Sequence, residues 1–172
     1  MKLADFVVPE AIISDLRART KEGAIREMVD ALHAAGYVGK ADREDAVQAI
    51  LYRERLGTTG WGQIGAAIPE ARHRAVARLV SVIALSREGV EFDAWGGGPV
   101  HILFLLACPP DRPADFLRAA EMVSWLLKVE DFRDRLRRAE SREEIVGLIA
   151  EADRDSLWEA GRIRLHPDRP PA

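Results

Sequence analysis

The sequence contains a single cysteine, few histidines and no long apolar run, and these shortages exclude several classes of protein. Cys108 alone can form neither an internal disulfide nor a cysteine-based zinc site. The longest apolar run, ILFLLAC at 102–108, is far shorter than the roughly 20 residues that a membrane-spanning helix needs. The opening residues, MKLADFVVPE, lack the long apolar core of a signal peptide. We therefore expect a cytoplasmic protein with no membrane-inserted segment.

An excess of positive charge is also absent, because 25 Lys and Arg residues face 28 Asp and Glu residues, for a net charge of −3. This balance gives no electrostatic reason to expect nucleic acid as a partner. No histidine stands at metal-ligand or catalytic-triad spacing from another candidate residue, so zinc and hydrolase sites have no support. We expect neither a metal nor another cofactor. The four histidines are His33, His73, His101 and His166.

The 172 residues that are present suffice for one domain with a sizeable core, but not for two. Apolar side chains recur at helical spacing in several segments, and Thr20 and a capping box from Ser141 to Glu144 mark helix starts. Two short runs rich in β-branched and apolar residues have the character of buried strands. The predicted helices span 20–36, 42–56, 113–129, 131–139 and about 141–152, and the predicted strands span 77–86 and 100–108.

Helices come first, strands cluster in the middle and helices close the chain. This order predicts the α/β (α+β) class, a sheet with helices on both faces, in which 100–108 is a central strand. Phe116 and Leu117 are predicted to face inward from the helix that follows this strand. Because the tail has no clear period, residues 1–153 form the predicted domain and residues 154–172 a C-terminal extension.

Residues 57–73, GTTGWGQIGAAIPEARH, form a glycine-rich loop that runs into a carboxylate. Its segment 60–65 is a literal G-x-G-x-x-G, but a dinucleotide fingerprint needs a strand before it and a helix after it. Here a helix precedes the loop, and Pro69 pushes Ile68 out of helical geometry. A phosphate loop is excluded too, because Gln63 occupies its lysine position. Two interpretations stay open: backbone N–H groups that cradle an anion, or a tight turn that glycine alone permits.

The segment RERLGTTGWGQIGAAIPEAR resembles the signature of enzyme IIA domains of the phosphoenolpyruvate-dependent sugar phosphotransferase system (PTS). The match is to the fructose/mannitol and nitrogen-regulatory branch, EIIA type 2, and it extends over roughly residues 3–152. The resemblance implies a mixed β-sheet flanked by helices, with Arg53, Glu54 and Pro69 as structural parts of the motif. The positions that fit the signature are Arg53, Glu54, Thr58, Thr59, Gly60, Gly62, Gly65, Ala67, Ile68 and Pro69.

The resemblance also implies a chemistry. In the family, the histidine after the proline accepts a phosphoryl group from the phosphohistidine of the carrier protein HPr. It then passes that group to a cysteine or histidine on an enzyme IIB domain. Nearby hydroxyl and N–H groups must neutralise the transferred oxygens, and no metal or nucleotide is needed. This phosphate-binding role would fall to Thr58, Thr59, Gly60, Gly62 and Gly65.

The sequence departs from the family at the acceptor position, where Pro69 is followed by Glu70. A second histidine of the family, near the start of the helix after the long strand, is matched by Phe116. A carboxylate is already anionic and repels an incoming phosphoryl dianion. We expect Glu70 to be a permanent, partial mimic of phosphohistidine, with its carboxylate satisfied by Thr58, Thr59 and glycine N–H groups. The alternative is a solvated Glu70 on a scaffold that binds proteins through other surfaces.

Two functions follow from these residues. The favoured one is a regulatory, protein-binding module without phosphoryl transfer, since function is argued from the site rather than from the fold. Its partner would be an HPr-like or IIB-like PTS protein or a regulated target protein, and a homodimer is compatible with it. The other function is an active phosphocarrier between HPr and a IIB domain, with His73 or Glu70 as the acceptor.

Overall fold

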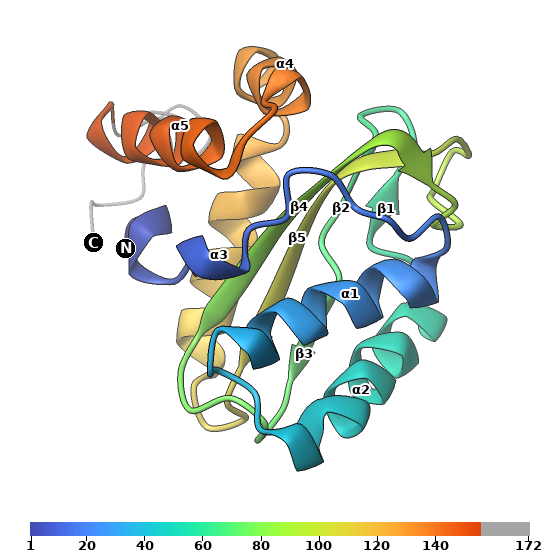
Figure 1. The fold of residues 1–172 in the computed structure, drawn as a ribbon, viewed down its shortest axis with the longest axis vertical. Helices are drawn as coiled ribbons and strands as arrows, with labels where there is room; N and C mark the ends of the chain where they lie inside the picture. The colour runs from blue at the N-terminus through green and yellow to red at the C-terminus, as the bar shows by residue number, and fades with distance from the viewer. Residues whose placement is uncertain (156–172) are drawn as a thin grey trace, which may run out of the picture.

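The structure, a computed structural model, describes residues 1–155 and has five α-helices and five β-strands in that range (Figure 1). The helices are α1 (Lys21–Ala34), α2 (Arg43–Arg55), α3 (Pro113–Leu126), α4 (Glu130–Arg138) and α5 (Arg142–Arg154), and the strands are β1 (Gly60–Trp61), β2 (Ala66–Ala67), β3 (Glu70–Arg72), β4 (Val80–Val90) and β5 (Val100–Cys108). All five predicted helices and both predicted strands are confirmed, with shifted ends. Of the predicted extension 154–172, residues 156–172 lie outside the described residues.

The sheet is organised around β5, its central strand. β4 pairs antiparallel with one edge of β5, while β2 and β3 pair in parallel with its other edge, and β1 pairs antiparallel with β2. The N-terminal segment covers the outer edge of β4 through isolated bridges from Val7 to Ser81 and from Ile13 to Ala84. The predicted sheet is therefore confirmed as a mixed sheet, with 100–108 at its centre.

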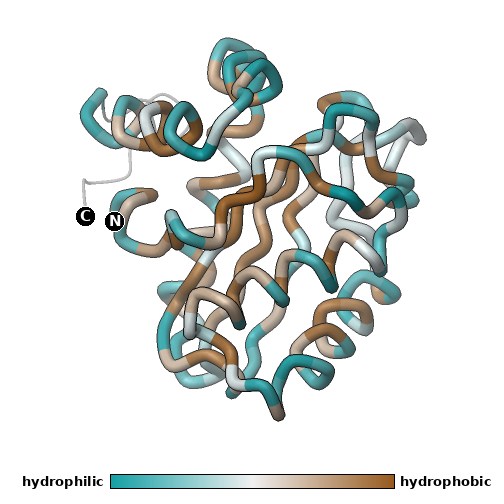
Figure 2. Tube along the Cα trace, viewed as in Figure 1, coloured by the Kyte–Doolittle hydropathy of each residue, from teal (hydrophilic) through white to brown (hydrophobic). Residues whose placement is uncertain are grey.

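Helices cover both faces of the sheet, which confirms the predicted α/β architecture (Figure 1). Leu103 and Leu105 of β5 belong to the core beneath α1 and α2, whereas Phe104 and Leu106 belong to the core beneath α3, α4 and α5. Successive side chains of a strand point to opposite faces, so one continuous apolar strand serves both cores. Figure 2 shows the same arrangement, with hydrophobic residues along β4 and β5 and hydrophilic residues toward the outside.

Side-chain caps fix the helix starts that the sequence indicated. The Thr20 hydroxyl accepts a hydrogen bond from Gly23 N–H at 3.2 Å, and the Ser141 hydroxyl accepts one from Glu144 N–H at 3.2 Å. The expected capping box at Ser141 needs a correction, because the Glu144 carboxylate accepts from Glu140 N–H (2.8 Å) rather than from the N–H of Ser141.

Two other expectations are corrected by the structure. The strand predicted at 77–86 begins at Val80 and continues to Val90, because a bulge after Leu85 lets the chain rejoin β5. Leu117 does not face inward and is 65% exposed, since α3 presents Ala119 and Met122 to the sheet instead. The strands β1, β2 and β3 were not predicted, because two or three residues carry no readable period.

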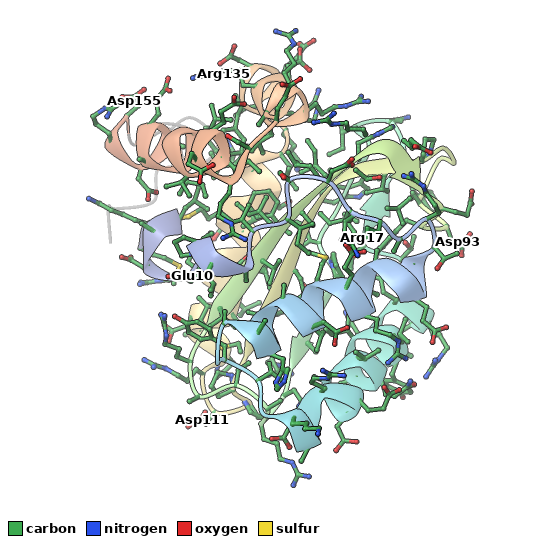
Figure 3. All side chains as sticks on the ribbon, viewed as in Figure 1. Glu10, Arg17, Asp93, Asp111, Arg135 and Asp155 are labelled. Carbon is green, nitrogen blue, oxygen red and sulfur yellow. The ribbon has the colours of Figure 1, made fainter. Side chains whose placement is uncertain are left out.

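Most charged side chains lie at the outside of the molecule, and Glu54, at 4% exposure, is an exception. Figure 3 shows Asp93, Asp111 and Asp155 at the periphery of the view, where water can solvate them. In residues 1–155, no helix combines the length and the apolar character that crossing a membrane requires.

Candidate functional site

Glu70 is the first residue of β3, and its backbone pairs with Leu106 of the central strand. The carbonyl of Pro69 accepts a hydrogen bond from Leu106 N–H at 2.9 Å, which holds this part of the chain against β5. The Glu70 side chain is 16% exposed and lies in an open pocket of about 560 Å³ between α2 and the start of α3. The pocket is also lined by Ala49, Tyr52, Arg53, Leu56, Ala71, Arg72, Pro110 and Phe116.

Arg53 of α2 holds the Glu70 carboxylate. Its Nε donates to Glu70 Oε1 at 3.1 Å, and its Nη2 lies 3.1 Å from the same oxygen. Its Nη1 donates to the carbonyl of Gly57 at 2.9 Å, which ties the start of the loop to the same guanidinium. Burial raises the pKa of Glu70 above its usual value, the Arg53 charge opposes this shift, and nearby Glu54 adds to it. The site therefore contains a partly desolvated ion pair.

Glu54, the next residue of α2, is buried at 4% exposure and fixes the middle of the loop. Its carboxylate accepts hydrogen bonds from the Thr59 hydroxyl and from Thr59 N–H, the latter at 3.2 Å and 3.3 Å to its two oxygens. Lys21, the first residue of α1, pairs with Glu54 at 3.2 Å and lies 4.8 Å from the centre of the Phe92 ring. This cluster joins α1, α2 and the loop through charge-assisted contacts.

Three further hydrogen bonds lie within the loop or join it to the neighbouring loop around Trp95. The Thr58 hydroxyl accepts from Gly60 N–H at 3.2 Å. Gly62 N–H donates to the carbonyl of Trp95 at 2.9 Å, and Gly65 N–H donates to the carbonyl of Gly62 at 3.2 Å. The N–H groups of Gly60, Gly62 and Gly65 are therefore engaged by other parts of the protein.

The expected partners of the Glu70 carboxylate are therefore corrected. Arg53 binds it, and neither Thr58, Thr59 nor a glycine N–H does so among the described hydrogen bonds. The Thr59 hydroxyl donates to Glu54 instead, because that carboxylate is buried beside it and needs hydrogen-bond donors from the protein. The alternative of a solvated Glu70 also differs from the structure, since this side chain is mostly buried.

Close packing explains Gly62. A Cβ at this position would lie 1.5 Å from the carbonyl oxygen of Gly97, so the two loops could not approach each other with any other residue. The G-x-G-x-x-G segment follows α2 and leads through β1 to β2, so it lacks the strand-to-helix setting of a dinucleotide site. Gly62 is thus required by the close approach of two loops, whereas Gly65, with a φ of 62°, adopts the left-handed turn geometry that favours glycine.

His73 lies apart from the Glu70 pocket and lines a small cavity beneath α1 and α2. Its backbone N–H donates to the carbonyl of Cys108 at 2.8 Å, and its Nδ1 accepts from Ala75 N–H at 3.1 Å. In the neutral ring the proton is therefore on Nε2, so neither nitrogen has a free lone pair. Phe116 does lie in the Glu70 pocket, as the sequence alignment indicated.

Sequence reasoning missed Lys21 and the apolar side chains around Glu70. Tyr52 of α2 is 59% exposed and Leu56, the C-cap of α2, is 69% exposed, and both line the pocket. Their outward direction breaks the helical stripe, which is the signal that could have identified them. Among residues 1–155, no three His, Cys, Asp or Glu side chains are grouped so that they could hold a metal ion.

Comparison with known proteins assigns the fold and this loop to one family. Residues 5–152 match the family described as phosphoenolpyruvate-dependent sugar phosphotransferase system, EIIA 2. The chain belongs to the PTS EIIA type-2 family. It is 39% identical over 132 residues to a PTS fructose-specific EIIA component of Haloferax volcanii. This match covers 77% of this chain and 84% of that protein. It is 32% identical over 150 residues to a nitrogen regulatory protein of Bradyrhizobium diazoefficiens, at 87% and 95% coverage.

The EIIA type-2 family also includes parts of larger proteins. The chain is 33% identical over 154 residues to a fructose-specific EIIABC component of Bacillus subtilis, of which it spans only 24%. Its fold matches the nitrogen regulatory protein IIA-Ntr of Neisseria meningitidis with a TM-score of 0.76 and 26% identity, covering 86% of this chain and 98% of that one. It also matches a IIA-mannitol protein of Escherichia coli that was solved in complex with phosphorylated IIB-mannitol. The TM-score is 0.67 and the identity 28%, and the match covers 83% of this chain and 95% of that one.

Proposed function

We propose that this EIIA type-2 protein is a regulatory, protein-binding module of the PTS that does not transfer phosphoryl groups. The Arg53–Glu70 ion pair supports the proposal most directly, because it puts a paired carboxylate at the position after the motif proline. A carboxylate held by a guanidinium is a poor nucleophile here, since Arg53 engages its Oε1 with two N–H groups and its negative charge repels a phosphoryl dianion. Glu70, held in place by Arg53, would present a fixed carboxylate in place of a transient phosphohistidine.

A protein partner would dock on the pocket around this ion pair. Tyr52, Leu56 and Phe116 supply apolar and aromatic surface, and Arg72 supplies a charge at the edge of the pocket. Exposed aromatic and apolar side chains beside arginine are typical of protein interfaces. We propose an HPr-like or IIB-like PTS protein, or a regulated target protein, in the cytoplasm as the partner. The complex of the mannitol relative with phosphorylated IIB-mannitol supports a partner of this kind.

The alternative, a phosphocarrier that uses His73 or Glu70, has less support. His73 lies beneath α1 and α2, with its Nδ1 lone pair engaged by Ala75 N–H, so it would have to leave its place to receive a phosphoryl group. Glu70 would have to break its contact with Arg53 and form an acyl phosphate.

A mass measurement tests the proposal. The protein is incubated with phosphoenolpyruvate, enzyme I and HPr, and its intact mass is recorded at neutral pH, where a phosphohistidine survives. We expect no gain of about 80 Da, the mass of one phosphoryl group. A gain of that mass in the wild type would overturn the proposal. The variants His73→Ala and Glu70→Gln would then show which side chain carries the group.

The matched variant Glu70→His shows whether the assay can detect transfer through this fold. If the pocket around Arg53 still accommodates a phosphoryl group, this variant should gain about 80 Da under conditions that leave the wild type unchanged. A silent Glu70→His variant would mean that the loop itself no longer supports transfer, which is also consistent with a binding module. Titration of HPr into the wild type and into Leu56→Ser by calorimetry then tests the docking surface.

A further inference from the structure

A second pocket lies toward the other end of β5 from Glu70. It has a volume of about 150 Å³, and its polar lining is made by Ser14, Ser86, Arg87, His101 and Arg137. Glu70 pairs with Leu106 of β5, and His101 lies five residues before Leu106 on the same strand. At about 3.3 Å per residue, His101 and Leu106 are separated by roughly 17 Å along the strand. This pocket is therefore not part of the Glu70 site.

The pocket is formed where β4 bulges away from β5. Leu85 pairs with Ile102 and Val90 with Val100, so residues 86–89 of β4 all lie opposite the single residue His101. A bulge of this kind bends the strand and redirects its side chains, and bulges are over-represented beside functional sites. Here Arg87 lies within the bulge, is exposed and lines the pocket.

Two hydrogen bonds hold the bulge in one conformation. The Ser86 hydroxyl accepts from Gly89 N–H at 3.0 Å, and His101 Nδ1 lies 2.9 Å from the carbonyl oxygen of Ser86. A carbonyl can only accept, so Nδ1 carries the proton and Nε2 is the ring atom left to bind a ligand. Among the described hydrogen bonds, Nε2 has no partner.

The two arginines of the pocket have no carboxylate partner within residues 1–155. Other arginines close to them do have a carboxylate partner. Arg19 pairs with Glu88, the residue after Arg87, at 2.8 Å, and Arg135 of α4 pairs with Glu151 at 2.6 Å. Arg87 and Arg137 take part in no such pair, although the Asp15 carboxylate accepts the backbone N–H of Arg87 at 3.1 Å and so anchors its main chain. No Asp or Glu lines the pocket. Two unneutralised guanidinium groups therefore lie at one cavity of a chain whose net charge is −3.

We propose that this pocket binds a small phosphorylated ligand through Arg87, Arg137, His101 and Ser14. A guanidinium matches the oxygens of a phosphate with two parallel N–H donors, and the Ser14 hydroxyl can donate to a further oxygen. Nε2 of the neutral His101 ring is an acceptor, so it can accept from the O–H of a singly protonated phosphate. The volume is below the roughly 300 Å³ at which pockets for drug-sized molecules begin, so the site takes a phosphate with few further atoms. The ligand would bind independently of any event at Glu70.

Nuclear magnetic resonance with inorganic phosphate tests this site. Phosphate is titrated into the isotope-labelled wild type at constant ionic strength, because a change of salt alone would screen surface charges. Saturable shifts of the amides at 86–89 and of the His101 imidazole are expected. Glycerol 2-phosphate should reproduce them, and acetate, a monoanion with two oxygens, should bind at least tenfold more weakly. The opposite order would overturn the phosphate assignment.

Substitutions on the same surface provide the controls. The exposed pair Arg87→Gln with Arg137→Gln should weaken phosphate binding at least tenfold, and an unchanged unfolding midpoint would show that the fold is kept. Arg138→Gln removes the adjacent arginine of α4, which lies outside the pocket lining, and should change affinity less than twofold. Equal losses in both variants, or shifts spread over all basic residues, would reduce the effect to nonspecific attraction and overturn the proposal.

Discussion

The Nε and Nη2 atoms of Arg53 both lie 3.1 Å from one carboxylate oxygen of Glu70, while its Nη1 donates to the Gly57 carbonyl. One guanidinium thus joins the end of α2, the start of the glycine-rich loop and the first residue of β3. Because a guanidinium is planar and rigid, its three contacts fix the positions of these segments relative to one another. The geometry of the candidate site depends on this side chain, and its removal has consequences that can be measured.

Arg53→Gln is expected to lower the free energy of unfolding by about 1–3 kcal/mol, because it leaves a mostly buried carboxylate without its charged partner. Urea denaturation at neutral pH measures this loss. In the double variant with Glu70→Gln the loss from Arg53→Gln should be smaller, since a neutral amide tolerates burial better than a carboxylate. Additive effects of the two substitutions would contradict a direct coupling between the side chains.

Glu70→Gln should change how stability depends on pH. The folded state raises the pKa of Glu70 above the ordinary value of 4.5, mainly through burial, so the folded protein binds this proton more tightly than the unfolded chain does. The stabilising effect of the proton is present as the pH falls toward 4.5 and is lost as the pH rises through the folded-state pKa. The variant lacks this titration, so its stability relative to the wild type should increase over that window and then level off.

Urea denaturation of both proteins from pH 4 to pH 8 checks this sign. Other carboxylates, such as Glu44 beside Arg26, have a lowered pKa and act in the opposite direction, but they are the same in both proteins and cancel in the difference. If the variant instead lost stability relative to the wild type as the pH rose, the attraction of Arg53 would outweigh the cost of burying Glu70.

The sequence predicted the large elements because each carries a repeated local signal. α1 shows a helical stripe that begins after Thr20 and ends before Gly36, and β5 is one uninterrupted apolar run at the centre of the sheet. Such patterns depend only on residues that are close in the sequence, so they can be recognised without knowledge of the tertiary contacts. The glycine-rich loop was also located, through its resemblance to a family signature rather than through any period of its own.

The sequence could not predict which side chain meets the Glu70 carboxylate. Thr58 and Thr59 are nearer to it along the chain, yet Arg53 reaches it from α2 because β3 pairs with β5 beside that helix. β3 has only three residues, so its pairing and the contacts that follow from it are tertiary. Lys21 and Glu54 meet for the same reason, from the ends of two different helices.

Glu54→Ala should destabilise the protein by about 2–4 kcal/mol, because it removes the acceptor of Thr59 N–H and of the Thr59 hydroxyl and leaves Lys21 without its partner. Arg55→Ala on the same helix is the control, since an exposed position should change stability by no more than about 0.5 kcal/mol. Hydrogen exchange at the Thr59 amide should also accelerate in Glu54→Ala. Similar losses in the two variants would show that the buried cluster adds no net stability.

Gly62→Ala and Gly147→Ala should shift stability in opposite directions. At Gly62 the added methyl would meet the Gly97 carbonyl oxygen at 1.5 Å, and because that atom belongs to the backbone the two loops must separate, at a cost of about 3 kcal/mol or more. At Gly147, in the exposed part of α5, nothing lies within 4 Å, so alanine should stabilise the helix by about 0.5–1 kcal/mol. Thermal unfolding of both variants compares the two, and a tolerated Gly62→Ala would mean that the loops are not in fixed contact.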